Sequence, residues 1–206
     1  MAVLPDTEVR PSRGGRPRDP SRDGVIRAAI LRLLGDVGYS ALTMDAVASE
    51  AGVGKATIYR RWRTKEELVV DTVSELNAVE AELTDTGSLE GDLRALMHAM
   101  VGMVNSPGGA ATKALLSSMQ HQPALAEAFR EGPMAVWRNA FDQVWERGER
   151  RGELGPGLSG SLTAEAIGAP LVQRWLVNGE PVDDAFADAV IDHVALPLLR
   201  AGGAKV

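Results

Sequence analysis

The chain contains no cysteine, three histidines and few aromatic residues, which make up 4% of its 206 residues. The absence of cysteine excludes disulfides, thiolate nucleophiles and thiolate metal sites. No segment is apolar over the roughly 20 residues that a membrane-spanning helix needs, and the N-terminus carries Asp6 and Glu8 where a signal peptide has an apolar run. We therefore expect a cytoplasmic protein.

Motifs of catalysis and cofactor binding are weak in this sequence. Gly155, Gly157 and Gly160 match the spacing of a dinucleotide-binding loop, but they follow a charged helical segment and not a strand. The G-x-S-x-G motif of hydrolases is missing, and the histidines and carboxylates lack the spacing of metal ligands. The sequence therefore predicts no catalytic residue, no cofactor and no metal site.

Charge is distributed unevenly along the chain, whose formal net charge is −6. Residues 1–70 hold 12 Lys and Arg against 9 Asp and Glu, a net +3. Residues 71–206 hold 10 against 19, a net −9. A basic N-terminal third on an acidic body indicates local, oriented attraction to phosphate groups.

The segment from Thr43 to Lys65 predicts two short helices joined by a tight turn. Thr43 is a good N-cap, and the apolar residues after it share one stripe at helical spacing, namely Met44, Val47, Ala48 and Ala51. Gly52 can adopt the left-handed conformation that ends the first of these helices. This is the layout of a helix-turn-helix DNA reader.

The second of these two helices has a cationic face. Val53, Ile58 and Trp62 can anchor it to the core. The residues left off the buried stripe are Lys55, Thr57, Arg60 and Arg61. Five basic residues and no acidic one lie between residues 55 and 65. A solvated charged helix face is the alternative interpretation, but the predicted turn favours DNA binding.

These residues resemble the DNA-binding domain of the TetR family of transcription repressors. The resemblance is carried by Gly38-Tyr39, Thr43, Ala48, Gly52-Val53, Thr57-Ile58-Tyr59, Trp62 and Lys65. It is specific from about Ser21 to Leu83 and weaker toward the C-terminus. It implies an all-helical homodimer whose N-terminal domain binds a palindromic operator in double-stranded DNA. The C-terminal domain is then expected to dimerise and to bind a small-molecule inducer.

Three cations of the second short helix are candidates for contacts to base edges in the major groove, namely Lys55, Arg60 and Arg61. Many members of the TetR family carry aromatic residues or histidine where this chain has Arg60 and Arg61. Base preference therefore does not carry over from the family.

Other residues are candidates for contacts to phosphate. The resemblance implies this role for Thr57, Tyr59 and Lys65, and Thr43 can add a contact from the N-terminus of its helix. Arg13, Arg16 and Arg18 lie in a segment rich in Pro, Gly and Arg, which suits insertion into a minor groove. A merely flexible basic tail is the alternative for these three arginines.

The fold class that we expect is all-α, with a three-helix DNA-binding domain followed by a larger helical ligand-binding and dimerisation domain. The predicted parts are a flexible basic arm over 1–19, the helix-turn-helix domain over 20–66, a connecting helix over 67–83, and the regulatory domain over 84–206. The first helix is expected from Ser21 to Val37 with Gly38 as its C-cap, and Thr64 caps the connecting helix. Later helices are expected near 88–105, 109–120, 123–151, 162–178 and 182–200, the third kinked or broken at Gly132-Pro133.

The last two predicted helices, near 162–178 and 182–200, are candidates for self-association in a four-helix interface. Apolar residues line the first of them at Ala164, Ile167, Gly168, Leu171, Val172, Trp175 and Leu176, and the second at Phe186, Ala189, Val190, Val194 and Leu198. The alternative is that both helices complete the core of one subunit. Paired half-sites on DNA favour the dimer.

Methionine and aromatic side chains of the central helices are candidates for an adaptable apolar inducer pocket. They are Leu96, Met97, Met100, Met103, Met119, Phe129, Trp137, Phe141 and Trp145. Plain core packing is the alternative, so the sequence assigns no ligand residue. Two other functions stay open beside a ligand-responsive repressor: a non-sequence-specific architectural DNA-binding protein and a helical enzyme that processes small molecules.

Overall fold

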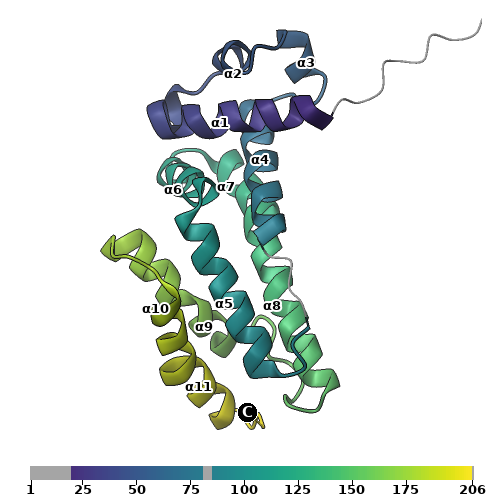
Figure 1. Cartoon of the computed structure of the whole chain (residues 1–206), viewed down its shortest axis with the longest axis vertical. Helices are drawn as coiled ribbons and strands as arrows, with labels where there is room; N and C mark the ends of the chain where they lie inside the picture. Colours follow the sequence, from purple (N-terminus) through teal and green to yellow (C-terminus); the bar gives the residue numbers. More distant parts are fainter. Residues whose placement is uncertain (1–19, 81–84, 206) are drawn as a thin grey trace, which may run out of the picture.

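A computed structural model describes residues 20–80 and 85–205 of the chain. The predicted basic arm, with Arg13, Arg16 and Arg18, lies outside the described residues. Within them all regular secondary structure is helical, which confirms the expected fold class (Figure 1). None of the described helices is long and apolar enough to cross a membrane.

The N-terminal part consists of four helices, α1 (Pro20–Ala41), α2 (Met44–Glu50), α3 (Lys55–Tyr59) and α4 (Lys65–Glu80). Gly38 interrupts α1 with a φ of 71°, as its predicted role of C-cap requires. Thr64 accepts a hydrogen bond from the Glu67 N–H at 3.1 Å and so caps α4. Both predicted helix boundaries are confirmed.

The remaining helices form the larger part of the molecule. They are α5 (Leu89–Asn105), α6 (Pro107–Met119), α7 (Pro123–Glu131), α8 (Pro133–Arg150), α9 (Leu162–Gln173), η1 (Arg174–Asn178), α10 (Asp184–Val190), η2 (Ile191–Ala195) and α11 (Leu196–Ala201). The helix expected over 123–151 is broken at Gly132-Pro133, because proline cannot donate to the preceding turn. The helices expected over 162–178 and 182–200 each contain a π-helical segment, η1 and η2.

One hydrophobic core extends from the N-terminal helices into the regulatory part. Ile30 and Leu34 of α1 share it with Leu115 of α6 and Phe129 of α7. In Figure 1 α6 and α7 lie directly beneath α1. The predicted boundaries at residues 66 and 83 therefore cross a continuous core, and the division into domains stays a prediction.

A second core joins α5, α8, α9 and the C-terminal helices. Ile167 and Leu171 of α9 are fully buried in it, and Val190 of α10 is 4% exposed. Our expectation that these three residues line a subunit interface is therefore wrong, because their side chains pack inside one subunit. Leu96, Met97, Met100 and Met103 are likewise buried core residues.

A buried charge pair fastens the start of α5 to the end of α8. Asp92 has no exposed side-chain surface, and it accepts hydrogen bonds from Arg151 at 2.8 Å and from the Thr86 hydroxyl at 2.7 Å. Burial alone would raise the pKa of Asp92, but the Thr86 N–H and hydroxyl and the Arg151 guanidinium together lower it. The carboxylate is thus held in its charged form.

We expect Asp92→Asn to lower the free energy of unfolding by about 3 kcal/mol, because Arg151 then loses a buried partner. The measurement is urea unfolding at neutral pH. Since the folded-state pKa of Asp92 lies below its unfolded value of 3.8, its contribution is present above about pH 4 and is lost as the pH falls through the folded value. The difference between the two proteins should narrow there.

Asp85→Asn is the matched control, because Asp85 also pairs with Arg151 but its side chain is 55% exposed. We expect a change below about 1 kcal/mol. Equal losses in the two variants would contradict a special role for the buried carboxylate.

Candidate nucleic-acid interface

The turn between α2 and α3 has the geometry that the sequence predicts. The Ala46 N–H donates to the Thr43 hydroxyl at 3.1 Å, which caps α2. Gly52 has a φ of 63°, and the Val53 N–H donates to the Ala48 carbonyl across the turn at 3.0 Å. The chain thereby leaves α2 sharply and enters α3 after two further residues.

Two apolar side chains fix α3 to the core. Ile58 is fully buried, and Trp62 is 6% exposed while its indole N–H donates to Asp71 of α4 at 3.0 Å. Trp62 is therefore structural, as expected. Because α3 is five residues long, its orientation depends on these anchors and not on its own hydrogen bonds.

Helices α2 and α3, which carry most of the predicted DNA contacts, lie together at one end of the molecule (Figure 1). Thr43, Lys55, Tyr59 and Arg60 are exposed, and Thr57 is half-buried. Within the described part of the chain Arg60 forms no ion pair. Lys55 donates to Asp45 of α2 at 2.6 Å, a pair in which both side chains are more than half exposed.

Arg61 and Lys65 lie deeper than the other predicted contacts. Arg61 pairs with Asp23 of α1 and lies over the Trp62 ring, and its side chain is 15% exposed. Lys65 donates to the Tyr39 carbonyl at 3.1 Å, and its ammonium lies 4.3 Å from the centre of the Tyr39 ring. Both cations fasten helices of this part to one another.

Tyr39 and Glu66 form a junction that sequence reasoning missed. The Tyr39 hydroxyl donates to a Glu66 carboxylate oxygen at 2.8 Å. Burial, then the hydrogen bond and charge of Glu66, raise the pKa of Tyr39. Burial opposes ionisation of Glu66, but hydrogen bonds from its own N–H, Tyr39 and Thr64 lower its pKa. The Gly38-Tyr39 pair was the available signal, because it places a large polar ring after a helix end.

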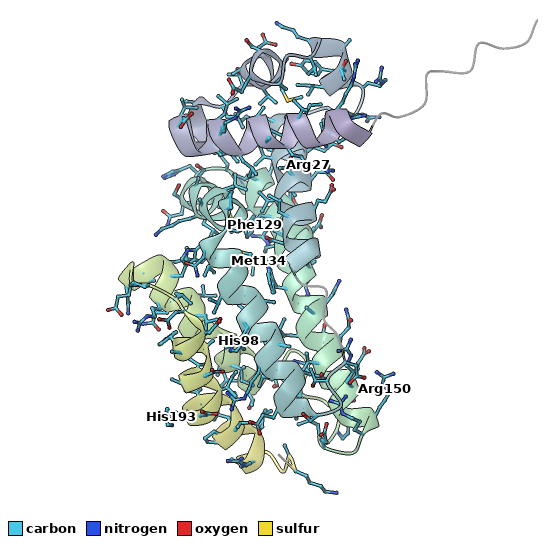
Figure 2. The ribbon with its side chains drawn as sticks, in the orientation of Figure 1. Arg27, His98, Phe129, Met134, Arg150 and His193 are labelled. Atoms are coloured by element: carbon cyan, nitrogen blue, oxygen red, sulfur yellow. The ribbon has the colours of Figure 1, made fainter. Side chains whose placement is uncertain are left out.

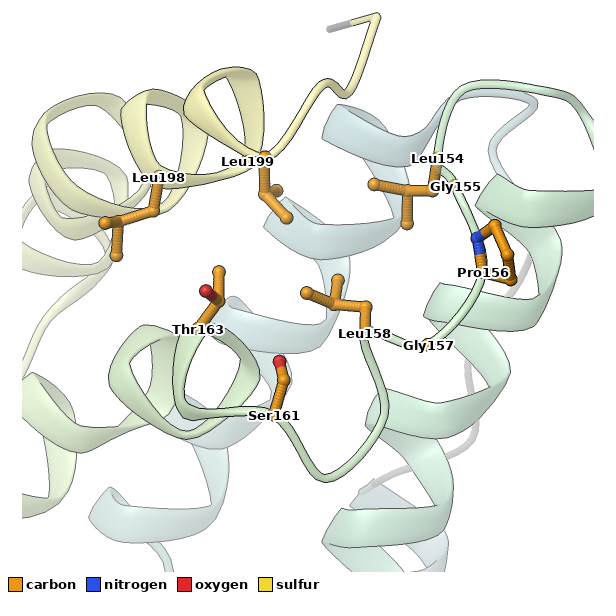
Figure 3. A pocket seen from close by; sticks show the side chains of 10 residues that line it. Leu154, Gly155, Pro156, Gly157, Leu158, Ser161, Thr163, Leu198 and Leu199 are labelled. Carbon is orange, nitrogen blue, oxygen red and sulfur yellow. The ribbon is translucent and has the colours of Figure 1, made fainter.

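The side chains predicted for an inducer pocket do not line the cavity that the structure shows at the opposite end. This cavity, of about 260 Å³, lies between the loop after α8 and helix α11 (Figure 3). Leu154, Leu158 and Leu199 converge on it, together with Gly155 and Gly157 of the glycine-rich loop. That segment is a loop followed by α9, as predicted, and it adjoins no strand in the described residues.

A capped helix, a glycine turn and a second helix with an exposed cationic face define a helix-turn-helix DNA-binding protein. Family models agree with this class. Residues 26–72 match the model of bacterial regulatory proteins of the tetR family, and residues 83–194 match the tetracyclin repressor-like C-terminal domain. The chain belongs to the TetR family of transcription regulators.

Named relatives extend over most of the chain. The DNA-binding transcriptional repressor TetR of Mycobacteroides abscessus is 33% identical over 186 residues, which cover 90% of this chain and 97% of the relative. The uncharacterized HTH-type transcriptional regulator YdeS of Bacillus subtilis is 30% identical over 175 residues, which cover 85% and 88% of the two chains. The protein is thus a DNA-binding transcription regulator.

Solved structures share the fold. The TetR family transcription regulator SCO0332 superposes with a TM-score of 0.68 at 27% identity, covering 85% of this chain and 97% of that one. FadR from Bacillus subtilis, solved in complex with stearoyl-CoA, gives a TM-score of 0.66 at 18% identity, covering 84% and 97%. At that identity the second likeness concerns the fold alone.

The turn itself can be tested by Gly52→Ala. An added Cβ at Gly52 meets nothing within 4 Å, so the cost is the left-handed φ of 63° alone. We expect a loss of about 1 kcal/mol in urea unfolding. Gly54→Ala is the control, because Gly54 has an ordinary φ of −68° and equally open surroundings. A loss as large at Gly54 would contradict the conformational explanation.

Proposed function

We propose that the protein is a homodimeric repressor that binds a palindromic operator through α2 and α3 and is released from it by a small-molecule inducer. The observation that carries this proposal is the exposed surface of Lys55, Tyr59 and Arg60 on a helix held rigidly by Ile58 and Trp62. A rigid frame is what base recognition by a short helix requires.

In the proposed complex, Lys55 and Arg60 reach base edges in the major groove. Arg60 is exposed and can approach guanine directly, whereas Lys55 must first exchange Asp45 for DNA. An exposed ion pair contributes little free energy, about 0–1 kcal/mol, so this exchange costs little. Thr57 and Tyr59 bind phosphates, and Thr43 adds a contact from the start of α2.

Arg61 and Lys65 act in the proposed complex chiefly by holding the frame. Their partners Asp23 and Tyr39 belong to α1, so Arg61 fastens the end of α3 to that helix and Lys65 fastens the start of α4 to it. Lys65 can still offer one of its N–H groups to a phosphate, since an ammonium has three donors. Arg13, Arg16 and Arg18 are proposed to add contacts in the minor groove.

The proposed dimer uses the exposed apolar side chains of the C-terminal helices. Leu162 and Val172 of α9 are 79% and 43% exposed, Val177 of η1 is 77% exposed, and Leu198 of α11 is 38% exposed. Large apolar residues exposed on neighbouring helices are typical of a protein interface. Two copies related by a two-fold axis bring two reading helices to successive half-sites.

Release by an inducer is supported by the shared core. Because α6 and α7 pack in the same core as α1, a ligand that moves the regulatory helices also moves the DNA-binding part. We propose that the inducer stabilises a separation of the two DNA-binding parts that no longer matches successive grooves. The stearoyl-CoA complex of Bacillus subtilis FadR supports binding of small molecules by a protein of this fold.

The first experiment is selection of bound duplexes from a random DNA pool at about physiological salt, where counterion competition suppresses non-specific binding. We expect enrichment of a palindrome. Lys55→Ala and Arg60→Ala should each weaken operator binding by about 1–3 kcal/mol and relax the sequence preference at separate positions. Titration of the enriched duplex by fluorescence anisotropy measures both effects.

Arg150→Ala is the matched control, since Arg150 is an exposed arginine at the far end of α8 (Figure 2). It removes the same charge and should leave sequence preference unchanged. Enrichment of no sequence, together with a steep salt dependence on all duplexes, would instead identify an architectural DNA-binding protein.

The dimer interface can be tested by Val172→Asp, which places a carboxylate on the exposed apolar face of α9. We expect the association constant to fall by at least about tenfold, because the charge must be desolvated on assembly. Sedimentation velocity over a concentration series measures this change. Val37→Asp on α1 is the control, because Val37 is similarly exposed at 50%. Equal sedimentation of both variants and the unchanged chain would refute the interface.

A further inference from the structure

A carboxylate lies beside the cations that we propose contact DNA. Asp45 is the second residue of α2, and its Oδ2 accepts a hydrogen bond from the Lys55 Nζ of α3 at 2.6 Å. The Asp45 and Lys55 side chains are 58% and 63% exposed, so the rest of the described chain covers neither of them. Because Lys55 is proposed to contact a base edge, Asp45 has to lie beside the same base pairs in the complex.

The other carboxylate of α2 is directed elsewhere. Glu50 pairs with Arg32 of α1 at 3.2 Å. Five residues of an α-helix turn the chain by about 500°, so Glu50 points about 140° away from Asp45. Helix α3 carries no acidic residue. Asp45 is thus the carboxylate that α2 and α3 present to DNA in the proposed complex.

Structural roles explain this carboxylate only in part. Asp45 lies in the first turn of α2, where a negative charge complements the helix dipole, and it forms an exposed ion pair. Both effects are small at an exposed position. The phosphate backbone, by contrast, repels a carboxylate on any surface that approaches it. A negative charge at this place therefore needs a partner in the DNA itself.

The major groove offers a carboxylate two kinds of hydrogen-bond donor, the N4 amino group of cytosine and the N6 amino group of adenine. Guanine presents N7 and O6, and thymine presents O4, all of which are acceptors and repel an ionised carboxylate. When Lys55 leaves Asp45 to contact a base, the freed carboxylate is therefore stabilised only where an amino group faces it.

We propose that Asp45 is a specificity-determining residue, which accepts a hydrogen bond from the amino group of a cytosine or adenine beside the base that Lys55 contacts. The inference rests on the proposed function. The Lys55 Nζ and the Asp45 Oδ2 start 2.6 Å apart, and successive base pairs are about 3.4 Å apart, so both groups meet the same base pair or two adjacent ones. In a G·C pair, Lys55 binds the guanine O6 and Asp45 binds the cytosine N4.

The core beneath the two helices fixes the place of the carboxylate. Val47 of α2 and Ile58 of α3 are fully buried in one core, and the turn at Gly52 joins the two helices. The lysine side chain is long and flexible, so Lys55 alone can reach several neighbouring acceptors. The aspartate side chain is short, so the carboxylate stays where α2 holds it. Asp45 thereby restricts the sequence at one position of each half-site.

The test selects bound duplexes from one random DNA pool with the full chain and with Asp45→Ala, at the same salt concentration. We expect the unchanged chain to require cytosine or adenine at one position of each half-site, and Asp45→Ala to lose that requirement while it keeps the rest of the palindrome. Replacing the required base by thymine or guanine should weaken binding of the unchanged chain about tenfold, and binding of Asp45→Ala less than about twofold. Fluorescence anisotropy with the substituted duplexes measures both ratios.

Asp45→Asn separates a base contact from the loss of a charge. An asparagine side chain pairs with adenine through its N6 and N7 atoms, so the preference at this position should move to adenine. A carboxylate that only complements the helix dipole or holds Lys55 would not change which base is selected.

Glu50→Ala is the matched control, because it removes an exposed, ion-paired carboxylate from the same helix on a side turned away from Asp45. It should leave the base preference unchanged. A gain in affinity for every duplex that Asp45→Ala and Glu50→Ala share is an effect of net charge, and it cancels when the two variants are compared.

The outcomes separate this inference from the proposed function. If Asp45→Ala enriches the same palindrome with the same preference at every position, Asp45 does not contact a base, and the proposed function stands. Enrichment of no sequence by the unchanged chain would overturn both. The melting temperature of each variant is measured beside these selections: a fall in Asp45→Ala without a change in base preference would assign Asp45 to the fold and overturn its role in specificity.

Discussion

The contact on which the structure depends is the packing of α1 and α4 against α6 and α7 in a single hydrophobic core. Ile30 and Leu34 of α1 meet Leu115 of α6 and Phe129 of α7 there, and Ile58 inserts into the same core from α3. Since α3 has five residues, it cannot hold its own shape in water. The helix that we propose reads DNA is therefore positioned by a core that the regulatory helices complete.

Three of the four cations on or beneath the proposed DNA-binding surface have partners within the chain, whereas Arg60 forms no ion pair with the described residues. Lys55 pairs with Asp45 at the surface, Arg61 pairs with Asp23 at greater depth, and Lys65 is engaged by Tyr39. The exposed pair of Lys55 and Asp45 can be exchanged for a contact with DNA at little cost. The deeper contacts of Arg61 and Lys65 also hold helices together. Acidic partners next to the reading helix lower the attraction to any phosphate backbone, which leaves more of the binding free energy to base contacts.

Local signals predicted most of the elements, including the two helices and the turn that carry the proposed DNA contacts. Thr43, Gly52 and Gly132-Pro133 act within a few residues of themselves, so the cap, the turn and the helix break could be read from the sequence. The burial of Ile167 and Leu171 could not, because an apolar stripe does not say which neighbour covers it. The π-helical segments η1 and η2 were also missed, since so short a change of helix type has no pattern of its own in the sequence.

Helix α4 links the DNA-binding part to the regulatory helices through contacts along its length. The first turn of α4 is fastened to α1 by Lys65 and Glu66, which both contact Tyr39. Glu75 of α4 pairs with Arg27 of α1. Beyond the first turn, Val70 and Ser74 meet the break between α7 and α8, where a Cβ added at Gly132 would lie 2.6 Å from the Ser74 Oγ. Because α4 contacts both α1 and the helices α7 and α8, the position of the DNA-binding part is tied to the packing of the regulatory helices.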